Sequence, residues 1–147
     1  MVTDRRARRV IVCAAALYLL GVARMTLWPD FASPEQFDAL RSAVAWLTAR
    51  SIPVSYDGVE AAANVVMFVP FGVLGGLLVS RRHRGAVLAV GCTTSAAIET
   101  SQLLFLPTRV ATLQDVVMNT LGAAIGLLGL VVVVAVRETR PDATRVQ

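Results

Sequence analysis

The sequence predicts an all-α integral membrane protein with four transmembrane helices in two hairpins and one short amphipathic helix outside the membrane. Two observations predict this fold class. First, 56% of the 147 residues are hydrophobic, which is more than a soluble domain normally carries. Second, most of them fall in four stretches close to the roughly 20 residues that a helix needs to cross a bilayer, and none alternates as a membrane β-strand would. The predicted transmembrane helices cover residues 10–28, 59–80, 86–106 and 116–136, within one membrane domain spanning residues 1–147.

The placement of the arginines predicts how these helices are oriented. All the basic residues are arginines except for one histidine, and ten of the fourteen arginines lie in residues 5–9, 81–84 and 137–145. Carboxylates outnumber arginines in the other two connections, 29–58 and 107–115. Because arginine-rich connections stay in the cytoplasm, we expect both termini to be cytoplasmic. The net charge of +4 then reflects topology and contact with anionic lipid, and no basic patch on a soluble face indicates nucleic-acid binding.

The first predicted helix also resembles a secretory signal peptide, because arginines precede its apolar run. That run continues to Trp28 without a suitable cleavage site, so we interpret it as a transmembrane helix. The two cysteines, Cys13 and Cys92, both lie inside predicted transmembrane helices. Neither a disulfide framework nor a cysteine metal site is therefore expected.

The long connection after the first helix contains a predicted amphipathic helix, residues 34–48. Ser33 is a suitable N-cap, with Pro34 at the first helical position and Gln36 at the third. Apolar side chains then recur at helical spacing, namely Phe37, Leu40, Val44 and Leu47. The helix lies either on the outer membrane surface, with Trp46 among the lipid headgroups, or against the helical bundle.

The second and fourth predicted helices each carry a pair of glycines spaced four residues apart. Such pairs allow helix backbones to approach closely in membranes, so we expect these helices to pack through them. The pairs are Gly72 with Gly76 and Gly122 with Gly126. The similar segments 64–67 and 115–118, which precede the pairs, suggest that the chain consists of two related hairpins.

Polar residues near the outer ends of the last three predicted helices form the candidate binding site. Glu99 is costly inside a membrane, by about 2.5–3.5 kcal/mol on the lower estimates, and Gln102 shares its helix face. In the predicted orientation, four more residues lie at a similar depth, namely Asn64, Arg109, Asp115 and Asn119. Hydrogen bonds between helices would be enough to explain the Asn and Gln side chains, but holding helices together does not need a carboxylate. The combination therefore favours a binding site.

These residues resemble the motifs of the VanZ-like family. Residues 64–72, NVVMFVPFG, are similar to its segment N-x-x-x-F-x-P-x-G, and residues 99–122 are similar to its second block, E-x-x-Q…R…D-x-x-x-N-x-x-G. The resemblance covers residues 64–126. It implies a multi-pass protein of the bacterial cytoplasmic membrane with a role in the cell envelope. The family takes its name from a protein that raises resistance to teicoplanin, a glycopeptide antibiotic with a lipid tail.

The residues and the resemblance together favour binding of an amphiphile at the outer leaflet, with its head on Arg109 and its tail between helices. A lipid-linked cell-wall precursor, a phospholipid or the acyl tail of a glycopeptide would fit. One alternative is a membrane enzyme acting on such lipids with Glu99 as general acid or base, and another is a small proton-coupled transporter. Whether the chain is an enzyme stays open, and it could form an oligomer. We expect no cofactor, and no metal because dense ligand motifs are lacking.

Overall fold

The computed structural model describes residues 4–27, 34–51, 54–106 and 111–139, and most of this part of the chain is helical. The helices, in chain order, are α1 (Arg5–Leu27), α2 (Pro34–Thr48), α3 (Tyr56–Leu78), the short 3-10 helix η1 (Arg81–His83), α4 (Arg84–Phe105) and α5 (Leu113–Thr139). No strand occurs among the described residues. The predicted all-α class is confirmed.

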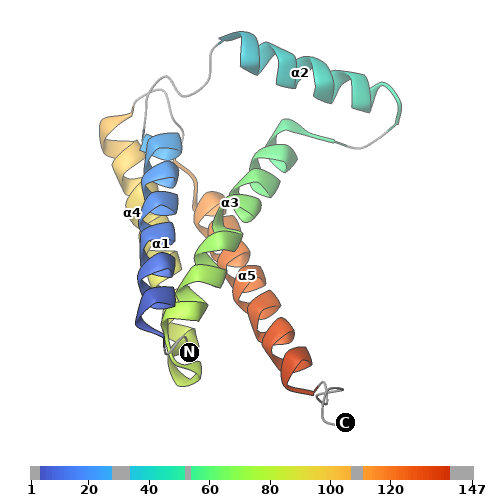
Figure 1. Ribbon diagram of the computed structural model, residues 1–147. Helices are drawn as coiled ribbons and strands as arrows, with labels where there is room; N and C mark the ends of the chain where they lie inside the picture. The colour runs from blue at the N-terminus through green and yellow to red at the C-terminus, as the bar shows by residue number, and fades with distance from the viewer. Residues whose placement is uncertain (1–3, 28–33, 52–53, 107–110, 140–147) are drawn as a thin grey trace.

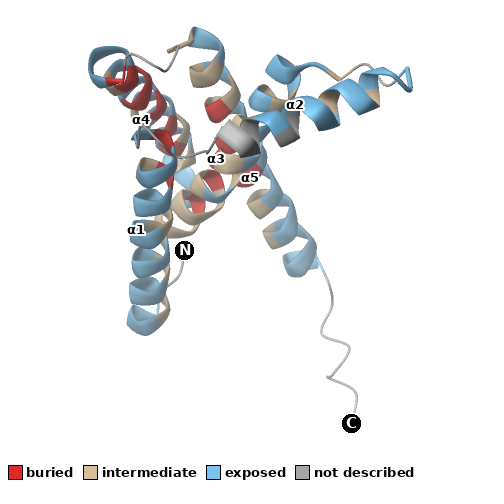
Figure 2. Cartoon of the chain, turned by 90° about the horizontal axis from the view of Figure 1, so that it is seen from above, coloured by how far each residue is buried: buried red, intermediate tan, exposed pale blue. Residues whose placement is uncertain are grey.

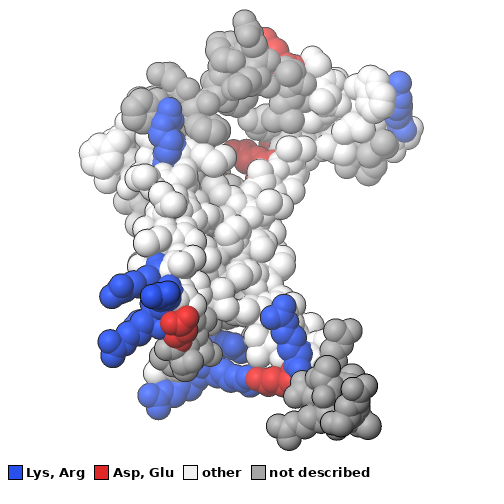
Figure 3. All heavy atoms as spheres, in the orientation of Figure 1, with Lys and Arg blue, Asp and Glu red and all other residues white. Residues whose placement is uncertain are grey.

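The helices form a bundle with two distinct ends (Figure 1). α3 and α5 cross and form the largest interface, while α1 and α4 lie side by side. We call the end where α1 begins and α5 ends the arginine end, because the basic side chains gather there (Figure 3). The opposite end, where α4 ends and α5 begins, is called the polar end.

Within the described residues, three helices are long and apolar enough to cross a membrane, namely α1, α3 and α5. α4 has 22 residues, which is long enough, but it does not meet the same standard of hydropathy. Its polar side chains explain the difference, because Ser95, Glu99 and Gln102 all face the interior of the bundle and are buried. The predicted count of four transmembrane helices and their layout in two hairpins therefore stay predictions.

Glycines allow α3 and α5 to cross in backbone contact. All four glycines of the two predicted pairs lie at this crossing, namely Gly72, Gly76, Gly122 and Gly126. A Cβ atom on Gly72 would lie 1.9 Å from the carbonyl oxygen of Ala123, and one on Gly126 would lie 2.0 Å from that of Val69. No side chain fits at either position, so the crossing depends on glycine.

The apolar core is small and lies between α1, α3 and α4. Val22, Phe68 and Ile98 are its buried members. Beside them the Tyr18 hydroxyl donates a 2.7 Å hydrogen bond to the Met67 carbonyl oxygen, which ties α1 to α3. Figure 2 shows that buried residues concentrate on α4 and on the crossing of α3 with α5, whereas α1 and α2 are largely exposed. Many exposed side chains are large and apolar, such as Leu17, Leu20 and Val66, and an apolar outer surface suits contact with lipid.

α2 lies across the polar end and has little contact with the other helices (Figure 1). It covers the same residues as the predicted amphipathic helix. Trp46 is 55% exposed, and the guanidinium carbon of Arg50 lies 3.4 Å from the centroid of its ring. Just beyond the helix, Ser51 adopts a left-handed backbone with φ of 62°.

Candidate functional site

The start of α5 is held by a hydrogen-bonded cap that includes a residue from α4. Thr112 immediately precedes α5, and its Oγ1 accepts a 3.1 Å hydrogen bond from the backbone N–H of Asp115. This contact is half of a capping box, in which the side chain of the third helical residue normally returns to the N-cap N–H. Here the Thr112 N–H donates instead to Oε2 of Glu99 at 3.0 Å. Glu99 thereby supplies the missing half of the box from another helix.

The carboxylate of Asp115 is consequently available for a different helix. Its Oδ1 accepts a 2.5 Å hydrogen bond from the side-chain amide of Asn64 in α3. Asn64, Glu99 and Asp115 come from α3, α4 and α5, and Thr112 lies in the connection between α4 and α5. The structure therefore brings Asn64, Glu99 and Asp115 into one network at the polar end. These three residues and Thr112 are called the polar layer.

The polar layer places two carboxylates at the N-terminus of a long helix. Glu99 is buried, with 9% of its surface exposed, and Asp115 is half-buried in the first turn of α5. The positive end of a helix dipole favours negative charge at this position. The arrangement thus offsets part of the cost of burying two acidic groups among apolar helices.

A second pair of polar residues lies one helical turn deeper, between α4 and α5. The Asn119 side-chain amide donates to Oγ of Ser95 at 2.8 Å, and these residues are only 2% and 0% exposed. The Oδ1 atom of Asn119 is buried and has no hydrogen-bond partner among the described residues. An unsatisfied buried acceptor costs about 1–3 kcal/mol, so this part of the site retains capacity for a hydrogen-bond donor.

Gln102 has a different role. Its side-chain amide donates a 2.9 Å hydrogen bond to the backbone carbonyl oxygen of Thr26 near the end of α1. Thr26 is itself buried and donates its hydroxyl to the carbonyl oxygen of Val22. Gln102 therefore joins α4 to α1, and this contact alone explains its position on the buried face of α4.

Arg109, the residue predicted to receive an anionic head, lies outside the described residues. The other five members of the predicted site are described, and the structure brings four of them together around α5, namely Asn64, Glu99, Asp115 and Asn119. Gln102 instead contacts the end of α1. The predicted set thus separates into a cluster of two carboxylates and two amides around α5 and one contact between α4 and α1.

Two residues of the network were missed by the sequence reasoning, although both carry a signal. Thr112 stands three residues before Asp115, which is the spacing of a capping box. Ser95 stands four residues before Glu99, so it shares the buried face of α4. The spacing predicts that these residues are near the site, but not that Glu99 would replace Asp115 in the cap.

The described contacts of the polar layer are hydrogen bonds. Ser95 contacts an amide and not a base, so it is not an activated nucleophile. Among the described residues, the hydroxyl–imidazole contact is that of Ser80 with Nδ1 of His83, at 2.8 Å, and it stabilises η1 at the arginine end. In the same part of the chain no group of three or more candidate ligands could hold a metal ion.

The model of a family described as VanZ/LLP1 matches residues 15–134 of the chain. A search of the curated proteins and a search of the solved structures both found no match. The matched range includes the polar layer, Asn119 and the crossing of α3 with α5.

Proposed function

This chain belongs to the VanZ/LLP1 family, and from that premise we propose that it is a bacterial cell-envelope protein that binds the head of an amphiphile at its polar layer. One observation carries the proposal. Two carboxylates belong to one network, in which Glu99 accepts from the Thr112 N–H and Asp115 accepts from the Asn64 amide, whereas neutral side chains would suffice to hold three helices together. A carboxylate accepts several hydrogen bonds, so Asp115 retains acceptor capacity beside the bond from Asn64.

The proposed topology has four membrane-spanning helices with both termini in the cytoplasm. α1 begins and α5 ends at the arginine end (Figure 1), which requires an even number of crossings between them. α4 supplies the fourth crossing by running back beside α1 toward the polar end. Since arginines favour the cytoplasmic side, the polar layer faces the outside, and the charge distribution in Figure 3 supports this orientation.

The proposed ligand has three parts. Hydroxyl or amino groups of its head donate to the carboxylates of the polar layer. An anionic group of the head binds Arg109, since a guanidinium matches phosphate and carboxylate geometry. Its acyl or polyprenyl tail lies against exposed apolar side chains near the ends of α4 and α5, such as Phe105 and Leu113. A lipid-linked cell-wall precursor and a lipid-tailed glycopeptide both have this composition.

The direct test is ligand binding by the purified protein. We expect native mass spectrometry in detergent to detect a complex with an added lipid-linked disaccharide precursor. Glu99→Gln should weaken this complex about tenfold or more, because a charge-assisted hydrogen bond is roughly twice as strong as a neutral one. Thr100→Val is the matched control, since Thr100 is the next residue of α4 and is exposed. Equal binding by Glu99→Gln and the wild type would contradict the proposal.

A further inference from the structure

A groove at the start of α1 is separate from the polar layer and lies at the opposite end of the bundle. Its described lining consists of Arg5, Arg8, Arg9, Val12 and Cys13. These positions are three or four residues apart, so they lie along one face of the helix. The groove is therefore cationic over its first turn and apolar over the next.

Within the described part of the chain, no ion pair involves the three arginines of this groove. The neighbouring Asp4 side chain accepts a 2.9 Å hydrogen bond from the backbone N–H of Arg6 and so caps α1. The ion pairs among the described residues involve other arginines, Arg41 with Asp38 and Arg81 with Glu138. An external anion is the natural counter-charge for three exposed guanidiniums on one face.

We propose that this groove binds an anionic phospholipid, with the phosphate on Arg5, Arg8 and Arg9 and an acyl chain along Val12 and Cys13. α1 is one of the helices able to cross a membrane, and its apolar run begins at Val10, directly after the arginines. The arginines consequently lie at the level of the lipid phosphates when α1 spans the bilayer. The change from cationic to apolar along one face matches the order of head and chain in a phospholipid.

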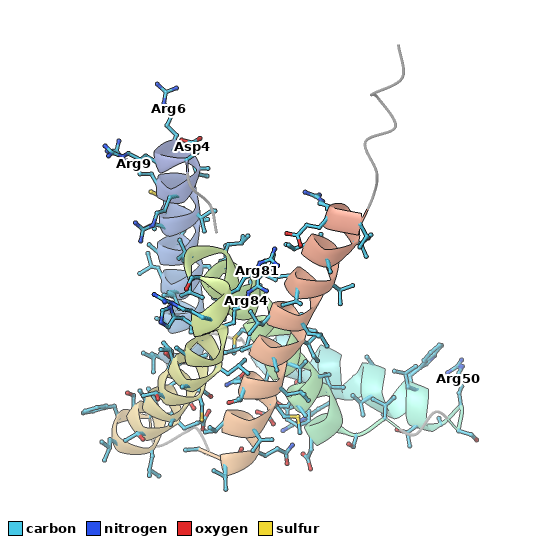
Figure 4. All side chains as sticks on the ribbon, turned by 90° about the horizontal axis from the view of Figure 1, so that it is seen from below. Asp4, Arg6, Arg9, Arg50, Arg81 and Arg84 are labelled. Atoms are coloured by element: carbon cyan, nitrogen blue, oxygen red, sulfur yellow. The ribbon has the colours of Figure 1, made fainter. Side chains whose placement is uncertain are left out.

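A matched control comes from arginines at the same end that do not line the groove. Arg6 leaves α1 in a different direction from Arg9 (Figure 4), and Arg82 belongs to η1 and is exposed. Replacing Arg6 and Arg82 by glutamine removes the same charge as replacing Arg8 and Arg9. Comparing the two double variants thus distinguishes lipid binding at the groove from the general effect of arginines on topology.

Cys13 supplies the readout because it lies in the groove and is exposed. In a Cys92→Ser background it is the remaining cysteine, and its rate of maleimide alkylation can be measured in neutral micelles. We expect phosphatidylglycerol to slow alkylation saturably, and phosphatidylcholine or inorganic phosphate at the same concentration to leave the rate unchanged. Arg8→Gln with Arg9→Gln should weaken the apparent affinity about 25-fold, because each arginine near anionic lipid contributes about fivefold.

The proposal is supported if Arg6→Gln with Arg82→Gln retains the protection that the Arg8 and Arg9 pair loses. It is overturned by equal protection from phosphatidylcholine, which would indicate apolar coverage alone, or from inorganic phosphate, which would indicate a small-anion site. Equal loss in the two double variants would likewise overturn it, since general charge would then explain the binding. Matching thermal midpoints of the two double variants show that both are folded when the rates are compared.

Discussion

The side chain of Glu99 in α4 accepts a hydrogen bond from the backbone N–H of Thr112. It so occupies the place that the side chain of Asp115 would take in an ordinary capping box. The exchange has two consequences. It fixes the end of α4 to the start of α5, and it leaves Asp115 to bind Asn64 of α3. Because Glu99 takes the place of Asp115 in the capping box, this motif joins α3, α4 and α5 at the polar end.

Removing the Glu99 side chain should destabilise the protein, while replacing it by glutamine should not. In Glu99→Ala the Thr112 N–H loses its acceptor inside the bundle, at a cost of about 1–3 kcal/mol. In Glu99→Gln a carbonyl oxygen remains to accept that hydrogen bond, and the uncharged side chain costs less to bury. Thermal unfolding in detergent measures both. An equal loss of stability in the two variants would show that the charge, and not the hydrogen bond, holds the cap.

Alanine at Gly72 or Gly126 should weaken the crossing of α3 and α5. The new Cβ would lie about 2 Å from a backbone carbonyl oxygen, so the helices must separate, and overpacking of this kind costs about 1–3 kcal/mol or more. Gly129→Ala is the control, because nothing lies within 4 Å of a Cβ at that position. Unfolding midpoints should fall for the first two variants and stay level or rise for the control. A control as unstable as the others would point to a general intolerance of α5.

The hydrogen bond between Asn64 and Asp115 should appear as a coupling between α3 and α5. We expect Asn64→Ala and Asp115→Ala each to lower the free energy of unfolding, and the double variant to lower it by less than their sum. The interaction energy should be about 0.6–2 kcal/mol, as for hydrogen bonds between membrane helices. Additive effects would mean that the two side chains act independently.

Trp46 should report that α2 lies on the membrane surface. It is exposed on a helix with little contact with the bundle, and tryptophan favours the interface. In a Trp28→Phe background, its fluorescence should be quenched most by lipids brominated near the headgroup and less by lipids brominated near the chain end. Quenching by aqueous iodide alone would place α2 in water instead.

Much of the fold could be predicted from the sequence because membranes impose simple rules on it. Helix length, apolar runs and glycine spacing depend on local chemistry, and the structure has helices over each predicted stretch. α4 illustrates the limit, since its buried polar face lowers its hydropathy and leaves its crossing a prediction. The separate roles of Gln102 and Glu99 also required the structure, because both lie on one helix face and only the neighbouring backbone distinguishes their partners.

The Glu99 carboxylate is proposed to act in the function of the protein, beyond its part in the cap of α5. The most direct measurement is the susceptibility of a sensitive Gram-positive host to teicoplanin and vancomycin, with the wild-type chain or Glu99→Gln present in the membrane at equal levels. We expect the wild type to protect selectively against teicoplanin and Glu99→Gln to lose most of that protection while remaining folded. Equal protection from both chains, or no selective protection from the wild type, would contradict the claim.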